Sequence, residues 1–320
     1  MYPPIRLFTP DDYVMLNKLS NTLYPDYAIT VDETRFLDQH VGADGSHQRW
    51  VMEDNESLIA TCEYSQFLEG GRAGEFGGNV MVHPAFQRRG IGTHMVHHLL
   101  TALQSLNAVS LRNRVREDML AGRRFLEKQG FSETKRSWES LIDAQHFSRA
   151  CFASVEAAVR AQGIEITIAP TLTDDPERDQ KLYALYCELS QDVPGLARGK
   201  LMSYYAFMDY VLNGSLSLPD AFFVALHNGE YIGMSFLQAS RQDDTLYTGL
   251  TGVKRAYRRH GIALVLKLHA IAYAQAHNHQ QIRTWNDTTN MAILSVNERL
   301  GFVKQLAWIT YMKQFQFPQC

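Results

Sequence analysis

Two short segments of this chain combine amide, basic and small side chains in an order that suits phosphate binding. The first consists of Gln87, Arg88, Arg89, Gly90, Ile91 and Gly92. The second consists of Arg258, Arg259, His260, Gly261, Ile262 and Ala263. Each follows an apolar stretch and precedes apolar residues at helical spacing. A helix that begins there offers free backbone N–H groups and a partial positive charge, which together favour phosphate, while the small residues let the main chain approach it.

Both segments belong to a long internal repeat. Residues 80–131 align with residues 251–302 at a constant offset of 171 residues, with no gap and thirteen identities in 52 positions. Unrelated segments give roughly three identities at typical residue frequencies. The repeat is too long for a solenoid unit and therefore predicts two duplicated domains. The identities include Val82/Val253, Gly90/Gly261, Arg112/Arg283, Glu127/Glu298, Gly130/Gly301 and Phe131/Phe302.

The elements expected around these segments follow the same order in each copy. A strand, a helical region, a hairpin and an apolar strand precede the loop, and two helices separated by a strand follow it. The copies are expected to close with strands at Trp138–Ile142 and Trp308–Met312. This order predicts the α/β class with a mixed sheet in each copy. The expected domains are residues 1–143 and 164–320, joined by a helix over residues 144–163.

The loop pattern, an amide or arginine followed by Gly-x-Gly or Gly-x-Ala after a strand with valine, resembles the acetyl-CoA pyrophosphate loop of the GNAT superfamily of N-acetyltransferases. The Gly-Phe pairs at Gly130-Phe131 and Gly301-Phe302 resemble the end of that superfamily's last conserved helix. The resemblance covers nearly the whole chain, twice over. The tandem arrangement is similar to that of the mycothiol synthase group, although no residue here indicates mycothiol chemistry.

The resemblance implies an acyltransferase that uses acetyl-CoA as co-substrate and an amine as acceptor. Main-chain groups at Met81, Val82, Gly252 and Val253 would bind the pantetheine and polarise the thioester carbonyl. Donors directed at a developing oxyanion are a large contribution to acyl-transfer catalysis. The acceptor amine would attack directly, after losing its proton to a base or to water. No covalent enzyme intermediate is implied.

The chain departs from the family pattern at the helix that ends in Gly-Phe. The superfamily often carries a tyrosine four residues before this glycine, placed to protonate the departing thiolate, but Leu126 and Asn297 occupy the position here. Asn297 can hydrogen-bond sulfur without supplying a proton near neutral pH. Asn290 stands where many members keep an asparagine facing the cofactor, and Met119 replaces it in the first copy. The C-terminal copy is therefore expected to be the more complete site.

Candidates for a general base are Glu75 in the first copy and Tyr247 in the second, both near the strand that precedes the loop. Leu246 occupies the position aligned with Glu75. Both candidates also fit surface or packing roles. The alternative function is a catalytically silent acyl-CoA-binding sensor or scaffold, which the missing tyrosines favour, while the two intact loops argue for retained binding.

The composition of the chain bears on which classes of binding partner are expected. The net charge of −3 and the pI near 6.5 do not suggest a nucleic-acid partner, and no stretch is long and apolar enough to span a membrane. His94, His97 and His98 share a helical face, but no carboxylate or cysteine completes a metal site. We expect a cytoplasmic protein, monomeric or homodimeric, that acts on a small-molecule amine and binds no metal. Its four cysteines are expected to be reduced: Cys62, Cys151, Cys187 and Cys320.

Overall fold

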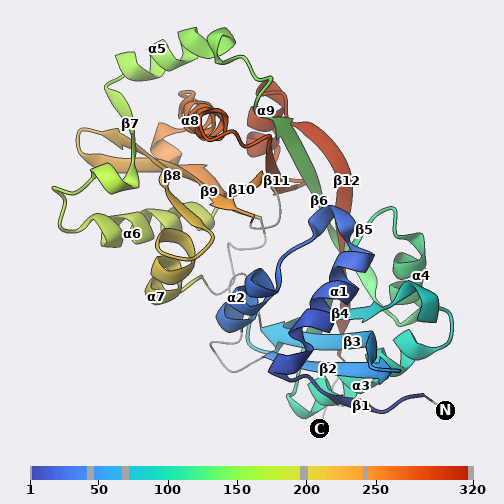
Figure 1. Ribbon diagram of the computed structural model, residues 1–320. Coiled ribbons are helices and arrows are strands. Elements are labelled where there is room, and N and C mark those ends of the chain that lie inside the picture. Colours follow the sequence, from blue (N-terminus) through green and yellow to red (C-terminus); the bar gives the residue numbers. More distant parts are fainter. Residues whose placement is uncertain (1, 42–46, 67–71, 195–200, 241–243, 316–320) are drawn as a thin grey trace. The chain divides into compact units, whose positions relative to one another are not determined.

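The computed structural model describes residues 2–41, 47–66, 72–194, 201–240 and 244–315. The chain forms two compact units (Figure 1). Unit 1 combines Met1–Arg136 with Trp308–Cys320, and unit 2 comprises Ser137–Ala307. Each unit builds a mixed sheet covered by helices, which confirms the α/β class expected from the repeat.

Unit 1 contains a sheet of strand order β1-β2-β3-β4-β5-β12. The neighbours β4 and β5 run parallel, and the other pairs run antiparallel. Its helices and strands are β1 (Ile5–Leu7), α1 (Tyr13–Leu23), α2 (Val31–Val41), β2 (His47–Asp54), β3 (Ser57–Gln66), β4 (Glu75–Val82), α3 (Ile91–Ser105), β5 (Ser110–Arg116), α4 (Leu120–Lys128) and the end of β12 (Val303–Gln314).

Unit 2 contains a sheet of strand order β7-β8-β9-β10-β11-β6. The neighbours β10 and β11 run parallel, as their counterparts do in unit 1. Its elements are most of β6 (Ser132–Asp143), α5 (Ala153–Ala161), β7 (Ile164–Ile168), α6 (Arg178–Ser190), α7 (Tyr204–Phe207), β8 (Ser217–His227), β9 (Glu230–Ala239), β10 (Thr245–Val253), α8 (Ile262–Ala276), β11 (Gln281–Asp287) and α9 (Met291–Arg299).

The closing strands are exchanged between the two copies of the repeat. Residues 137–143 of β6, from the first copy, pair with β11, and residues 308–314 of β12, from the second copy, pair with β5. The compact units therefore differ from the contiguous domains 1–143 and 164–320. The sequence indicates that each copy ends in a strand, but β5 and β11 are equivalent edges, so the pattern does not determine which edge each strand joins. The connecting segment belongs to unit 2, where α5 packs on α8.

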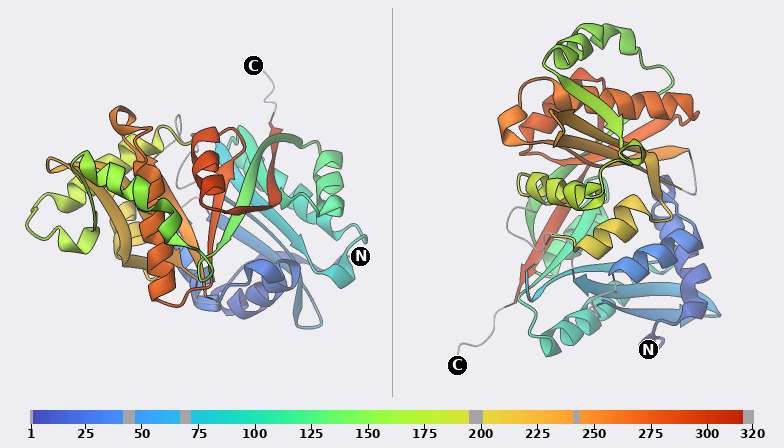
Figure 2. Two further views of the ribbon diagram at one scale, coloured as in Figure 1. Left: turned by 90° about the horizontal axis from the view of Figure 1, so that it is seen from above. Right: turned by 90° about the vertical axis from the view of Figure 1, so that its left-hand side faces the viewer.

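Apolar side chains cover both faces of each sheet. In unit 1, one core lies under α3 and α4 and includes Ile309 and Tyr311 of β12, while a smaller one lies under α1. In unit 2, α8 and α5 cover one face of the sheet, and α6 and α7 cover the other (Figure 2). No helix among the described residues is long and apolar enough to cross a membrane.

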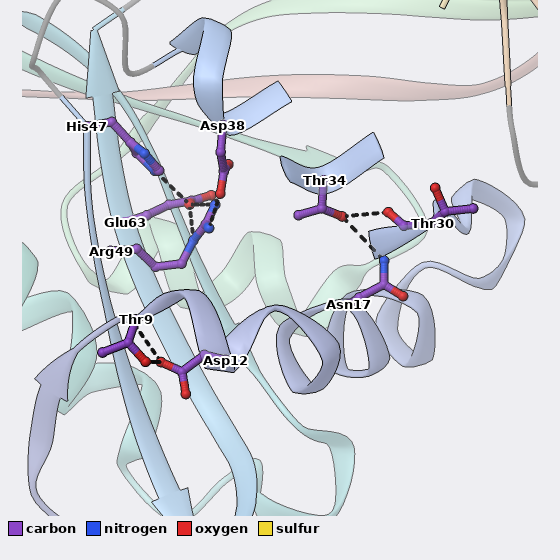
Figure 3. Close-up of polar contacts among 9 residues, drawn as sticks. All are labelled: Thr9, Asp12, Asn17, Thr30, Thr34, Asp38, His47, Arg49 and Glu63. Atoms are coloured by element: carbon purple, nitrogen blue, oxygen red, sulfur yellow. Dashed lines mark hydrogen bonds and ion pairs between the residues drawn. The ribbon is translucent and has the colours of Figure 1, made fainter. Parts of the chain in front are cut away.

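A buried ionic cluster joins α2, β2 and β3 in unit 1 (Figure 3). The Arg49 guanidinium donates to both carboxylate oxygens of Asp38, at 2.6 and 3.0 Å, and to Glu63 Oε2 at 2.6 Å. His47 Nε2 lies 3.3 Å from the same Glu63 oxygen. Although burial opposes the charged form, the Arg49 guanidinium and the hydrogen bond with His47 hold the pKa of Glu63 at about 2. The cluster fixes the α2 helix against the sheet.

Candidate active site

Both predicted phosphate segments form the same strand–turn–helix structure. A single helical turn follows the end of β4 or β10, and the next helix begins at Gly90 or Gly261. These two glycines have φ of +81° and +86°, in the left-handed region that residues with a Cβ rarely adopt. Arg88 and Arg259 are also left-handed, with φ of 61° and 67°. The conserved backbone geometry shows that the repeat preserves the loop's shape as well as its residue types.

Each loop leaves backbone donors at the start of a helix. The first intrahelical bonds run from His94 N to Gly90 O and from Val265 N to Gly261 O. The N–H groups of the preceding helical residues therefore have no acceptor within the helix. Together with the positive end of the helix dipole, they form an anion-binding position at each loop.

The first side chain of each loop fastens it to the preceding strand. Gln87 Nε2 donates to the Val82 carbonyl at 3.0 Å, and Arg258 Nε donates to the Val253 carbonyl at 3.0 Å. Arg258 also pairs with Asp192, which accepts from Arg255 as well. The two guanidinium groups hold the pKa of Asp192 at about 2. In unit 2 a carboxylate from the segment after α6 therefore lies beside the loop arginines.

A cavity opens beside each loop. The unit 1 cavity has a volume of about 460 Å³, and the unit 2 cavity about 670 Å³. Their walls include equivalent positions of the repeat, so they are two versions of one site. The shared positions are Val80/Thr251, Met81/Gly252, Val82/Val253, Gln87/Arg258, Met119/Asn290, Ala121/Ala292, Gly122/Ile293 and Phe125/Val296.

The predicted cofactor residues divide between cavity wall and loop. In unit 1 the wall includes Met81, Val82 and Gln87, whereas Arg88, Arg89, Gly90, Ile91 and Gly92 belong to the loop and the start of α3 outside it. In unit 2 the wall contains all but one of the predicted residues: Gly252, Val253, Arg258, Arg259, Gly261, Ile262, Ala263 and Asn290. The exception is His260, which hydrogen-bonds Gln162 in the segment after α5.

The strand before each loop separates from its parallel neighbour. Pairing of β4 with β5 stops at Gly77/Arg112, and pairing of β10 with β11 stops at Tyr247/Arg283. Beyond these pairs β4 and β10 continue to Val82 and Val253 without strand pairing on that side. Side chains take some of the backbone carbonyls there, because Asn113 Nδ2 donates to the Gly78 carbonyl, while Gln87 and Arg258 donate to the strand ends.

Only one of the two strands is bulged. The register of β10 against β9 shifts between Thr248 and Thr251, whereas β4 pairs with β3 without interruption. A bulge adds one residue and redirects backbone groups, often beside active sites. It also corrects the sequence alignment, because the residue that occupies the position of Glu75 is Thr245 and not Leu246. The bulge is therefore a backbone difference between the two sites.

The three candidate catalytic side chains lie outside both cavity walls. Glu75 forms an ion pair with Arg112 at the paired end of β4. Tyr247 stacks on Trp285, with ring centroids 5.5 Å apart, at the paired end of β10. Asn297 is only 2% exposed, and its Nδ2 donates to Asn286 Oδ1 at 2.7 Å. Its own Oδ1 is buried without a hydrogen-bond partner in the part of the chain that the structure describes.

Two polar side chains of unit 2, one of them in the cavity wall, were not selected from the sequence as site residues. Asp192 lines the cavity and holds the arginines, but it comes from the distant end of α6 and no motif marks it. Lys267 is 2% exposed within α8. Comparison of the two copies offers a signal for Lys267, because Val96 occupies the aligned position. Within the described residues no cluster of three potential metal ligands occurs.

Comparison with known proteins agrees with this geometry. Residues 13–131 and 181–302 each match the Acetyltransferase (GNAT) family, so the chain belongs to the GNAT family and contains two copies of its domain. No curated protein matches the chain in sequence.

Solved structures of tandem proteins share the fold over the full length. A GCN5-related N-acetyltransferase from Sphaerobacter thermophilus matches with a TM-score of 0.71 and 16% identity, covering 97% of this chain and 95% of that one. A tandem GNAT protein from the clavulanic acid biosynthesis pathway matches with a TM-score of 0.74 and 16% identity, covering 97% and 98%. Identities this low establish a common fold and leave the substrate open.

Proposed function

We propose that unit 2 transfers an acetyl or other short acyl group from acyl-CoA to an amine of a small molecule. The observation that carries this proposal is the continuity of the unit 2 cavity. Its wall runs from the N-terminus of α8 and Arg258 to β10 where that strand has separated from β11. A phosphate-binding end and a strand with available backbone groups are the two features that a CoA thioester requires.

We assign each part of the cavity to one part of the acyl-CoA molecule. The backbone N–H groups at Ile262 and Ala263, with the Arg258 guanidinium, bind the pyrophosphate. Asn290, at the start of α9, faces the pantetheine. Backbone groups of β10 at Gly252 and Val253 bind the pantetheine and orient the thioester carbonyl. The acceptor amine attacks the carbonyl carbon directly.

Unit 1 receives a binding or structural role. Its loop keeps the anion-binding geometry, but β4 lacks the bulge, and Val80, Val96, Leu126 and Phe131 contribute to an apolar inner wall. These observations support a copy that binds acyl-CoA without turning it over. If unit 2 also proves silent, the whole chain is an acyl-CoA sensor or scaffold, which is the second candidate function.

The free thiols of Cys62, Cys151 and Cys187 fit a reducing compartment such as the cytoplasm, and Cys320 lies outside the described residues. The acceptor expected there is a small amine, and the protein acts as a monomer or homodimer without nucleic acid, membrane or metal.

To test the two loops separately, we propose two variants, each of which introduces one carboxylate into one loop. Ala263→Asp puts a negative charge in the first turn of α8, where the helix dipole tolerates it but a phosphate does not. Gly92→Asp is the matched change in α3, where a Cβ would lie 3.4 Å from Phe125. Gly261 is a poorer target, because a Cβ there would lie 3.1 Å from Val155 and the φ is positive.

Calorimetric titration measures how many equivalents of acetyl-CoA each variant binds, and an assay with a panel of amines measures turnover. The proposal expects the wild type to bind and turn over acetyl-CoA, and Ala263→Asp to lose turnover and one equivalent of binding. Gly92→Asp is expected to lose at most the unit 1 equivalent and to keep turnover. Binding without turnover by the wild type supports the sensor, and turnover retained by Ala263→Asp contradicts the assignment to unit 2.

A further inference from the structure

Lys267 is a buried lysine without an ionic partner. It lies in the middle of α8, its side chain is 2% exposed, and its Nζ lies 4.6 Å from the centroid of the Phe302 ring. Within the described part of the chain, no carboxylate pairs with it. Burying an unpaired ammonium is unfavourable, so a lysine at such a position needs a reason beyond packing.

The first copy of the repeat indicates which part of the site corresponds to the position of Lys267. Its aligned residue, Val96, lines the unit 1 cavity together with Leu126 and Phe131. The residues of unit 2 that correspond to these three are Lys267, Asn297 and Phe302. Lys267 already contacts Phe302, as the correspondence requires. A valine and a leucine therefore line the inner end of the unit 1 cavity. In unit 2 a lysine and an asparagine take these two positions, and the cavity wall does not include them.

Further polar groups of unit 2 occupy positions that are apolar in unit 1. Asn297 Nδ2 donates to Asn286, which replaces Val115, while its buried Oδ1 lacks a hydrogen-bond partner among the described residues. The hydroxyl of Thr251, which replaces Val80, lies 2.8 Å from that of Ser235. Several apolar positions of one copy have thus become polar in the other, with an acceptor left unsatisfied. This pattern indicates a position prepared for a polar or charged ligand atom.

We propose that Lys267 donates a proton to the sulfur of CoA as the acyl group leaves it in unit 2. The inference rests on the proposed function, and it supplies the proton donor that Leu126 and Asn297 cannot provide. The acceptor nitrogen bonds to the carbonyl carbon, and the carbon–sulfur bond breaks with its electron pair remaining on sulfur. The ammonium proton passes to that sulfur, leaving free CoA thiol and a neutral lysine. The surplus proton of the acceptor nitrogen goes to water, and Lys267 regains one from water.

Burial gives Lys267 a suitable acidity, because loss of solvation lowers the pKa of its ammonium to about 7. An acid of this strength is protonated near neutral pH and can release its proton to a thiolate, whose ordinary pKa is about 8.5.

Charged and titratable groups on the elements packed around α8 have partners of their own. These pairs are Arg149 with Glu156, Arg283 with Glu139, Lys254 with Glu230, and His227 with Tyr257. Asp220 lies near Tyr273, and His269 near Arg149.

The first experiment measures acyl transfer by Lys267→Val, which copies unit 1, and by Lys267→Met, which keeps the length of the side chain. We expect kcat to fall roughly 10²-fold or more in both, with little change in KM for acetyl-CoA. In the wild type, kcat should decline as pH rises above about 7, because the neutral lysine has no proton to give, and this decline should be absent from both variants. Equal kcat and an unchanged pH profile would overturn the proposal.

The second experiment does not depend on turnover. The ultraviolet absorbance of the thiolate reports the titration of CoA bound to the protein, and desulfo-CoA serves as the ligand without sulfur. The thiol pKa of bound CoA should be lower in the wild type than in Lys267→Met, because the ammonium stabilises the thiolate, while desulfo-CoA should bind both proteins equally. The lowered pKa should disappear in Ala263→Asp, which places it in unit 2. Identical thiol titrations in wild type and Lys267→Met overturn the inference, whereas a lowered thiol pKa in a protein without turnover would leave Lys267 placed at the sulfur and reject only the proposed transfer.

Discussion

Arg258 Nε donates to the Val253 carbonyl at 3.0 Å, across the turn that joins β10 to α8. Gln87 makes the same bond to Val82 in unit 1, although its chemistry differs. The first side chain of the loop thus has a structural role common to both copies, namely to hold the strand end against the helix start. Gln87 has no counterpart to the remaining guanidinium nitrogens of Arg258, which bring a positive charge to the unit 2 cavity wall.

This division of roles predicts different results for two substitutions of Arg258. Arg258→Gln copies unit 1 and can keep the bond to Val253, so it should weaken acetyl-CoA binding only through the lost charge, by several-fold. Arg258→Ala loses both contributions and should raise the Kd at least about tenfold, in line with a charge-assisted hydrogen bond. Calorimetry at two salt concentrations checks this, and equal Kd values for the two variants would show that the bond to Val253 has no effect.

Asp192 is expected to oppose acyl-CoA binding. Its carboxylate lines the unit 2 cavity and pairs with Arg255 and Arg258, the groups available to a pyrophosphate. Asp192→Asn removes that negative charge and should lower the Kd for acetyl-CoA several-fold, more at low ionic strength than at high. Asp179→Asn is the control, because Asp179 pairs with Arg178 elsewhere in α6. A weaker affinity in Asp192→Asn would mean that the carboxylate positions the arginines for the ligand.

Lys267 should leave a signature in the pH dependence of stability. Its pKa is about 7 in the folded protein and about 10.4 in an unfolded chain, so the unfolded state binds the additional proton between these values. The free energy of unfolding should therefore rise with pH from about 7 to 10, relative to Lys267→Met, with a slope approaching 1.4 kcal/mol per pH unit. Denaturant titrations of both proteins across this range provide the difference, and parallel curves would place the lysine in solvent.

The cluster around Arg49 gives the free energy of unfolding of unit 1 a pH dependence of the same sign in the acidic range. The pKa of Glu63 is about 2 in the folded protein and about 4.3 in an unfolded chain. Its stabilising effect is present above pH 4.3 and is lost as pH falls through 2. Glu63→Gln should remove this part of the acid sensitivity. Arg49→Met removes the cation between two partly buried carboxylates, Asp38 and Glu63, and should destabilise unit 1 by up to about 3 kcal/mol at neutral pH. A loss below 1 kcal/mol would indicate that solvent reaches the cluster.

The sequence predicted the parts of the site that local chemistry determines. A glycine, a basic loop and an apolar helix predict the strand–turn–helix structure of both loops, because each feature depends on neighbours in the chain. The bulge in β10 escaped prediction, since it shifts the alignment by one residue between Thr245 and Thr251, where the two copies have few identities. Lys267 escaped because a single lysine in an apolar helix looks like a solvent-facing residue until its aligned partner, Val96, is placed in a cavity wall.

Strand exchange also escaped prediction, and it makes each unit depend on residues from the other copy of the repeat. Ile309 of β12 is fully buried in the core of unit 1, and Ile142 of β6 is 4% exposed in the core of unit 2. Each of the substitutions Ile309→Ala and Ile142→Ala should cost about 2–5 kcal/mol in the unit that contains the side chain.

Hydrogen exchange resolved by segment distinguishes the two units. Ile309→Ala should speed exchange in β5 and in α3, although α3 lies more than two hundred residues before Ile309 in the sequence. Exchange in α8 and β11 should stay slow. Ile142→Ala should do the reverse, because its side chain packs in the core under α8. If each substitution instead loosened its own copy of the repeat, the closing strands would belong to contiguous domains and the exchanged pairing with β5 and β11 would be wrong.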